Sequence, residues 1–162
     1  NEMVRTISLF LFFIFIGCEM NSKQIIKPEK FTYDTIKFNT VSKILENKFQ
    51  ANSPDHEIMN KIVQYWFDNR IKTDGFEGNL SVNVKQIQFD REKKQDYYKF
   101  SISLSLEFIE KKSSTNIKTY NVNSNEYGEI IGSFAIKDQD NLDVNLMHKS
   151  LESISLKLKE KN

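Results

Sequence analysis

Few residues in this 162-residue chain are of types that could do chemistry. The chain has one cysteine, Cys18, and two histidines, His56 and His148, and neither histidine has a second His or Cys at metal-ligand spacing. The stretch HEIMN that starts at His56 lacks the second histidine that a zinc-protease helix requires. We therefore expect both histidines on the solvated surface, and we predict no metal site, no cofactor and no catalytic residue.

Cys18 directly follows an almost wholly apolar run over residues 7–16. As a helix this run is about 15 Å long, roughly half the hydrocarbon thickness of a bilayer, so it is too short to span comfortably. Arg5 precedes the run and the small residue Gly17 follows it, which is the order of a secretory signal and its cleavage site. The sequence therefore predicts a cleaved signal peptide over residues 1–17.

The tetrapeptide Phe15-Ile16-Gly17-Cys18 resembles the lipobox of bacterial lipoproteins, although Phe15 stands where the family usually has Leu. The resemblance implies cleavage before Cys18, a diacylglycerol on its sulfur, and often a third acyl chain, such as palmitate, on the new amino terminus. Two or more chains anchor a protein stably where one is marginal. A plain signal peptide or an uncleaved anchor, with an incidental cysteine, is the alternative, but it would leave an exported chain with an unexplained free thiol.

Composition bounds the rest of the chain. Residues 1–17 hold one acid and one base, so the mature chain keeps the net charge of +1, which indicates neither a nucleic-acid partner nor a polycation. A chain of this size buries enough surface to fold without a disulfide or metal. Residues 18–30 are polar and contain Pro28, which predicts a lipidated cysteine and tether, and residues 31–162 are predicted to form a single domain.

Residues 53–75 carry the start and stop signals of a helix. Ser53 can cap it, Pro54 suits the first helical position, and Gly75 can adopt the left-handed conformation past the last turn. Residues at helical spacing form one stripe, which consists of Met59, Ile62, Val63, Trp66 and Arg70.

An aromatic triplet in this helix, Tyr65, Trp66 and Phe67, is followed one turn later by Arg70. All three rings cannot share the buried stripe, so we expect Trp66 in the core and Tyr65 or Phe67 at the helix edge. Arg70 could stack on Trp66 or cap the end of the helix. These four residues are the candidate interaction surface.

Alternating apolar and polar residues predict strands. The strands cover residues 31–41, 79–89, 97–110 and 115–136, and the stretch VSKILENKF after the first either extends it or forms a short helix. Changes of phase predict bulges near residues 34–35 and 85–86, and the charged stretch DREKKQD is expected to be a turn. Gly128 and Gly132 indicate a turn or bulge that interrupts the last segment.

A second helix is predicted at the end of the chain. Its stripe consists of Leu142, Leu146, Met147, Leu151, Ile154 and Leu158. The acids Asp138, Asp140 and Asp143 lack the central Gly and closing acid of an EF-hand, so they predict a helix-capping cluster. The order β-α-β-β-β-α favours an α+β two-layer sandwich, with a four-stranded mostly antiparallel sheet and two helices on one face.

The layout as a whole resembles small uncharacterised proteobacterial envelope lipoproteins. The resemblance is carried by the lipobox, the first strand, and a helix ending in Trp66 and Arg70 before Gly75 and Gly78. These proteins are similar in layout to lipopolysaccharide-assembly lipoproteins and the auxiliary lipoproteins of ABC-type transporters. The resemblance implies a non-enzymatic adaptor or assembly factor for a membrane or transport complex, with an envelope protein partner.

The expected location is the periplasmic face of the outer or inner membrane, reached through the lipid anchor. Two other functions stay open at this point. A small lipid- or hydrophobe-carrying domain would need a cavity under the sheet, and an enzyme with a dispersed site would need polar groups converging in one cleft.

Overall fold

The computed structural model describes residues 35–46 and 49–161. The predicted signal peptide, the lipidated cysteine and the tether lie outside these residues, as does residue 34 of the bulge expected at residues 34–35. The elements are β1 (Ile36–Phe38), β2 (Ser42–Glu46), α3 (Pro54–Arg70), β3 (Ile71–Thr73), β4 (Asn79–Lys94), β5 (Tyr97–Lys111), β6 (Ile117–Ile131) and α4 (Ile136–Lys159).

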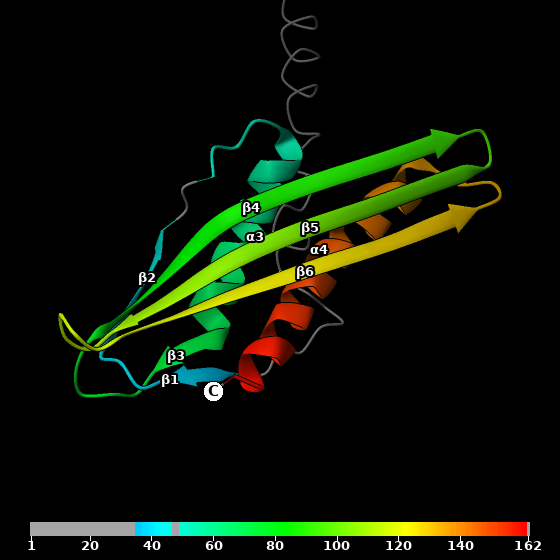
Figure 1. Ribbon diagram of the computed structural model, residues 1–162. Coiled ribbons are helices and arrows are strands. Elements are labelled where there is room, and N and C mark those ends of the chain that lie inside the picture. Colours follow the sequence, from blue (N-terminus) through cyan, green and yellow to red (C-terminus); the bar gives the residue numbers. More distant parts are fainter. Residues whose placement is uncertain (1–34, 47–48, 162) are drawn as a thin grey trace, which may run out of the picture.

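The main sheet has the strand order β2-β4-β5-β6. Strands β4, β5 and β6 are antiparallel neighbours, whereas β2 runs parallel to β4, and β1 and β3 form a separate parallel pair. Figure 1 shows both helices on the same side of the long strands. The predicted α+β class is therefore confirmed. The stretch after the first predicted strand neither extends it nor forms a helix: it is the separate strand β2, which supplies the fourth strand of the main sheet, whereas β1 of the first predicted strand pairs only with β3.

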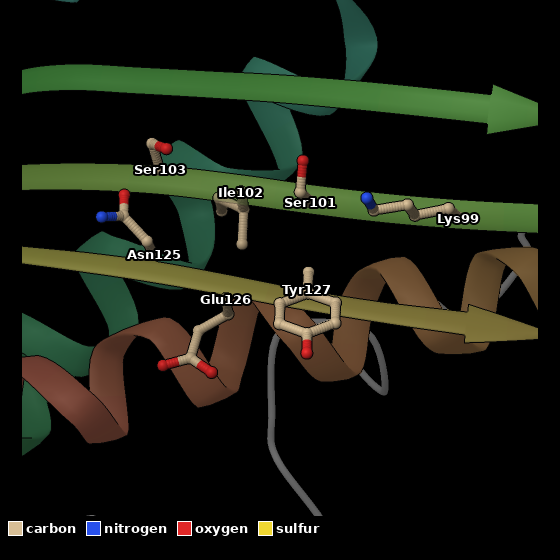
Figure 2. A pocket seen from close by; sticks show the side chains of 7 residues that line it. All are labelled: Lys99, Ser101, Ile102, Ser103, Asn125, Glu126 and Tyr127. Atoms are coloured by element: carbon tan, nitrogen blue, oxygen red, sulfur yellow. The ribbon is translucent and has the colours of Figure 1, made fainter.

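The two faces of the sheet differ because side chains along a strand point alternately to opposite sides. In β5 every even residue from Tyr98 to Glu110 is buried, and the odd residues between them are half-buried. Figure 2 shows Ser101, Ser103 and Asn125 among the polar side chains along β5 and β6. The sheet therefore has one apolar face under the helices and one polar outer face.

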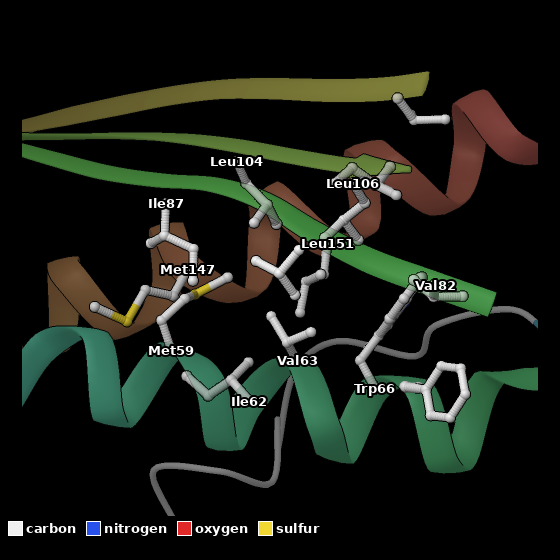
Figure 3. Close-up of a cluster of buried hydrophobic side chains, with 14 of the residues drawn as sticks. Met59, Ile62, Val63, Trp66, Val82, Ile87, Leu104, Leu106, Met147 and Leu151 are labelled. Carbon is white, nitrogen blue, oxygen red and sulfur yellow. The ribbon is translucent and has the colours of Figure 1, made fainter. Parts of the chain in front are cut away.

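The apolar face and the two helix stripes enclose the core. Figure 3 shows Met59, Ile62, Val63 and Trp66 of α3 directed toward side chains of the sheet and of α4. The predicted stripes of both helices are confirmed in their apolar members. These are buried at Met59, Ile62, Val63, Trp66, Leu146, Met147, Leu151, Ile154 and Leu158, with Leu142 packed against them. Side chains therefore occupy the space where a carrier would need its cavity.

Strand β4 is longer than the sequence predicts. The charged stretch DREKK continues the strand to Lys94, and only Gln95 and Asp96 separate it from β5, so the prediction of a charged turn was wrong. Its charges fit a strand because Glu92 lies opposite Lys99 and because Arg91 bonds to residues of both helices. The predicted bulge is confirmed, since the register shifts between Val84 and Gln86.

Two glycines have roles other than those predicted. Strand β6 is not interrupted at Gly128, and a Cβ there would lie 2.8 Å from Leu142 Cδ1, so this glycine allows α4 to pack closely on the strand. Gly75 does not end the first helix, which stops at Arg70 because the chain turns directly into β3. Instead, a Cβ at Gly75 would lie 2.5 Å from the Asn39 carbonyl carbon.

Gly78→Ala should destabilise the fold by about 2–3 kcal/mol. Gly78 has a φ of +77°, which other residues rarely adopt, and a Cβ there would lie 2.6 Å from the Lys111 carbonyl oxygen. Gly132 is the matched control, because its φ is +96° but a Cβ there would meet nothing within 4 Å. Gly132→Ala should cost only about 1 kcal/mol. Urea unfolding of both variants checks the difference, and equal losses would mean that the close approach to Lys111 is unimportant.

Candidate functional site

The structure separates the four residues of the candidate interaction surface. Trp66 and Phe67 are buried, so their assignment to a surface was wrong, while the prediction of Trp66 in the core is confirmed. The indole Nε1 donates to Ser155 Oγ of α4 at 2.9 Å, and the ring packs edge-on against Phe108 at 6.4 Å between centroids. The indole therefore ties α3 to α4. Tyr65 and Arg70 are half-buried, with Tyr65 at the helix edge.

The carboxyl end of α3 is capped by a lysine from another element. Lys43 Nζ of β2 donates to the carbonyl oxygens of Phe67 at 2.8 Å and Ile71 at 2.6 Å, and it lies 4.5 Å from the Phe67 ring centroid. Burial lowers the pKa of Lys43, with the nearby Lys72 as a second cause. The lysine cation thus caps the negative end of the helix, a role that the sequence suggested for Arg70.

Four polar side chains meet in an Arg91 cluster, which consists of Arg91 (β4), Tyr98 (β5), Asp55 (α3) and Asp143 (α4). Arg91 donates from Nη2 and Nε to Asp143 Oδ2 at 2.7 and 3.0 Å, and from Nη1 to Asp55 Oδ2 at 2.9 Å. The Tyr98 hydroxyl donates to Asp143 Oδ1 at 2.8 Å. One guanidinium thus joins the β4–β5 hairpin end of the sheet to the amino-terminal halves of both helices.

The electrostatics of the Arg91 cluster favour a structural role. Burial raises the pKa of Asp143, and the hydrogen bonds from Arg91 and Tyr98 oppose that change. Burial, followed by the hydrogen bond to Asp143, raises the pKa of Tyr98 to about 12. Because Tyr98 stays protonated and both carboxylates accept from Arg91, none of these groups is poised as a general base. The cluster links both helices to the sheet.

Sequence reasoning missed this cluster because its two acids lie in the helices, 36 and 52 positions from Arg91. Asp143 was expected to cap α4, but the helix begins at Ile136, which leaves Asp143 in its second turn. Only Asp138 caps the helix through its side chain, since its Oδ2 accepts from the Ala135 N–H at 2.8 Å.

Tyr98 should make the fold sensitive to alkaline pH. The folded state holds the phenolic proton more tightly than the unfolded state, so this contribution is complete below about pH 10 and is lost as the pH rises through about 12. We expect the free energy of unfolding to fall more steeply with pH in the wild type than in Tyr98→Phe, which lacks the titrating group. Urea titrations from about pH 9 to pH 11.5 measure both slopes. Parallel slopes would contradict the raised pKa.

Both histidines were predicted to lie on the solvated surface, and this prediction was wrong. His148 is buried in α4. His56 is half-buried between the rings of Phe49 and Phe89, each at 5.0 Å between centroids, and its Nδ1 lies 2.7 Å from Ser53 Oγ. Both histidines are covered because the buried stripe of each helix is wider than its strongly apolar residues alone indicate. Within the described ranges, no group of three or more His, Cys, Asp or Glu side chains is placed to hold a metal ion.

A shallow depression of about 280 Å³ lies on the outer face of the sheet. Side chains of β5 and β6 line it, including Lys99, Ser103, Asn125 and Tyr127 (Figure 2). The lining contains hydroxyl, amide, ammonium and carboxylate groups, the last from Glu126. It is suited to contact with a surface rather than to enclosing a small molecule.

Large apolar side chains are exposed at both ends of the sheet. The hairpin-end patch consists of Tyr127 and Ile131 of β6, which are 70% and 77% exposed. The loop-end patch consists of Val41, Ile44, Phe76 and Ile117, all more than half exposed. Sequence reasoning did not find either patch, because alternation alone does not show that an outward-facing residue lacks neighbours. In the part of the chain that the structure describes, neither helix is long and apolar enough to cross a membrane.

Comparison with known proteins gives distant similarities only. No protein-family model matches the sequence, and no curated protein matches it significantly. Among solved structures, the chain is similar to a minor lipoprotein from Acinetobacter baumannii, with 15% identity over 72% of this chain and 91% of that one and a TM-score of 0.38. It is also similar to rare lipoprotein B from Shewanella oneidensis, with 9% identity over 75% of this chain and 99% of that one and a TM-score of 0.37.

A third similar structure is a homolog of neuraminyllactose-binding hemagglutinin from Helicobacter pylori. It shares 11% identity over 85% of this chain and 94% of its own, with a TM-score of 0.34. Two of these three structures are bacterial lipoproteins by description. Similarity at TM-scores below 0.5 does not transfer a function, so we argue function from the residues of the chain itself.

Proposed function

We propose that this protein is a lipid-anchored, non-enzymatic component of the cell envelope that acts as an adaptor or assembly factor for a membrane or transport complex. The observation that carries the proposal is the placement of the sole cysteine, Cys18, directly after Gly17 and an apolar run too short to span a bilayer. The proposed location is the periplasmic face of the outer or inner membrane.

The anchor is tested by the chemistry of Cys18. The mature protein purified from its own membranes should begin at Cys18 and carry two or three acyl chains by mass spectrometry. Membranes washed with carbonate should retain it, whereas Cys18→Ser should be released. Release of the wild-type chain from the membranes by carbonate, with an unmodified Cys18 sulfur, would contradict the proposal.

The Arg91 cluster supports a non-enzymatic role. This cluster brings two acids and a phenol together under the sheet, and its carboxylates are held by one guanidinium. The exposed features described above are two apolar patches and a shallow depression, which are suited to binding. An adaptor needs such a surface away from its membrane anchor.

The hairpin-end patch is the proposed partner surface. Two lysines cover the edge of β6 just before this patch. Lys157 of α4 donates to the Asn123 carbonyl oxygen at 2.7 Å, and Lys161, just past the end of α4, donates to the Asn121 carbonyl oxygen at 3.1 Å. Such lysines protect an edge strand from pairing with other chains. The strand continues past these contacts to Tyr127 and Ile131, where an aromatic side chain borders the shallow depression. Exposed aromatic residues beside polar groups are typical of protein interfaces.

Site-specific photocrosslinking in native membranes tests this surface. A photoreactive residue at Tyr127 should give a discrete adduct with one membrane protein, and the exposed Lys61 of α3 is the control that should not. The substitution Ile131→Ser should reduce copurification of the same protein several-fold without altering thermal unfolding, because Ile131 is exposed. Recovery of a clean monomer in gentle detergent, with no adduct at either position, would contradict the adaptor role.

A further inference from the structure

The loop-end patch is built around a phenylalanine with almost no protein contacts. Phe76 is 99% exposed and lies in the loop between β3 and β4. Backbone hydrogen bonds fix this loop at both ends, since the Gly75 N–H donates to the Thr40 carbonyl oxygen and the Val41 N–H donates to the Gly78 carbonyl oxygen, each at 3.1 Å. The loop is therefore held in place while its largest side chain extends into solvent.

The patch continues onto the outer face of the sheet. Ile44 pairs with Ser81, and Ser81 pairs with Ile109, so the three residues form one row across β2, β4 and β5. Paired residues point to the same face of a sheet. In the next row Lys111 pairs with Ile117, two positions along each strand from the pair of Ile109 and Thr119. Isoleucines of three strands thus gather at the end of the sheet where Phe76 lies.

Lysines border this apolar surface. Gly78 lies against the Lys111 carbonyl oxygen and Lys112 Cα, which places the Phe76 loop beside the turn between β5 and β6. Lys111 and Lys118 are exposed there. The acids of the loop are Glu77, which is exposed, and Asp74, whose Oδ2 lies 3.5 Å from Lys37 Nζ. Apolar tips bordered by lysines match the interface of an anionic bilayer.

We infer that the loop-end patch lies on the membrane, with the Phe76 ring inserted among the lipids and the lysines at the level of anionic head groups. This inference rests on the proposed lipid anchor for its orientation. The seventeen steps from Cys18 to Thr35 reach at most about 55 Å, and Thr35 directly precedes β1, whose partner β3 leads into the Phe76 loop. An anchored domain can therefore bring this end to the bilayer.

The same orientation directs the hairpin-end patch away from the lipid. Ile117 and Ile131 are the two ends of β6, fourteen residue steps apart, which corresponds to about 46 Å along the strand. Figure 1 shows the three long strands running together from the loop end to the β4–β5 hairpin. The sheet thus separates a lipid-facing end from a partner-facing end.

Fluorescence quenching by brominated phospholipid tests the inference, because the native Trp66 is buried and its emission is a constant background that the brominated lipid cannot reach. The acylated full-length mature protein is reconstituted in vesicles of phosphatidylethanolamine and phosphatidylglycerol. Phe76→Trp should be quenched and shifted to shorter wavelength, whereas Tyr127→Trp at the hairpin end should behave as the wild type does. Equal quenching at the two positions, or none at residue 76, would overturn the inference.

The mature chain with Cys18→Ser separates this inference from the proposed anchor. Added to the same vesicles without acyl chains, it should still bind weakly, and a further Phe76→Ser change should lower its vesicle affinity about tenfold. Binding that is independent of Phe76 would overturn the inference, whatever the state of Cys18 in the native protein. A change in Phe76→Trp fluorescence with membrane protein but not with pure lipid would show that the patch binds protein instead.

Discussion

Trp66→Ala is expected to lower the free energy of unfolding by about 3–5 kcal/mol. The indole is completely buried and contacts both layers, because its ring packs against Phe108 of the sheet and its Nε1 donates to Ser155 of α4. Removing it leaves a cavity where α3, α4 and β5 meet. Urea unfolding followed by circular dichroism measures the loss, which is a large part of the stability of an ordinary domain.

Two further variants separate the parts of this effect. Trp66→Phe keeps most of the ring but not the Nε1 donor, and it should cost about 1–2 kcal/mol because Ser155 Oγ retains its own bond to the Leu151 carbonyl oxygen. Gln64→Ala, on the exposed face of the same helix, should change stability by about 0.5 kcal/mol or less. A Trp66→Ala variant as stable as Gln64→Ala would contradict the core described above.

Arg91→Met should destabilise the fold by about 3 kcal/mol. The change leaves the carboxylate of Asp143, whose side chain is only 10% exposed, without its cation. The expected loss is at the lower end for buried ion pairs because the Arg91 side chain is 35% exposed and partly screened by solvent. Urea unfolding at neutral pH measures it.

The matched control for Arg91 removes both charges. The double variant Arg91→Met with Asp143→Leu should be more stable than Arg91→Met alone, because most of the loss comes from an uncompensated buried charge rather than from the missing contact. Arg91→Lys keeps the charge but not the forked geometry, and it should fall between the wild type and Arg91→Met. If the double variant is the least stable of the three, the ion pair itself holds the helices.

Elements with a strict period were predictable. The unbroken alternation in β5 and the apolar stripes in α3 and α4 each depend on residues within a few positions of one another, and the structure confirms them. The bulge after Val84 was also visible as a change of phase. Predictions from single residues did less well, because a glycine such as Gly128 can serve close packing as readily as a turn.

The candidate site was the least predictable part. The aromatic triplet in α3 was predicted to be part of an interaction surface because three consecutive aromatic residues are unusual, yet Trp66 and Phe67 belong to the core. The exposed residues that carry the present proposals, Phe76, Tyr127 and Ile131, look ordinary in sequence. Exposure depends on which side chains approach from distant segments, so it cannot be assessed from neighbours along the chain.

In this protein, local features can be read from the sequence, whereas contacts between distant segments are known only from the tertiary structure. The signal-like run before Cys18, the helix stripes and the alternating strands are properties of short segments, since export signals and hydrophobic periodicity are local. The Lys43 cap on α3 and the bonds from Arg91 to the helix acids arise only when segments 24 to 52 positions apart are brought together. The loop-end patch likewise joins residues from β2, the Phe76 loop and β6. Hydrogen bonds and burial act through space over a few ångströms, so folding alone decided those contacts.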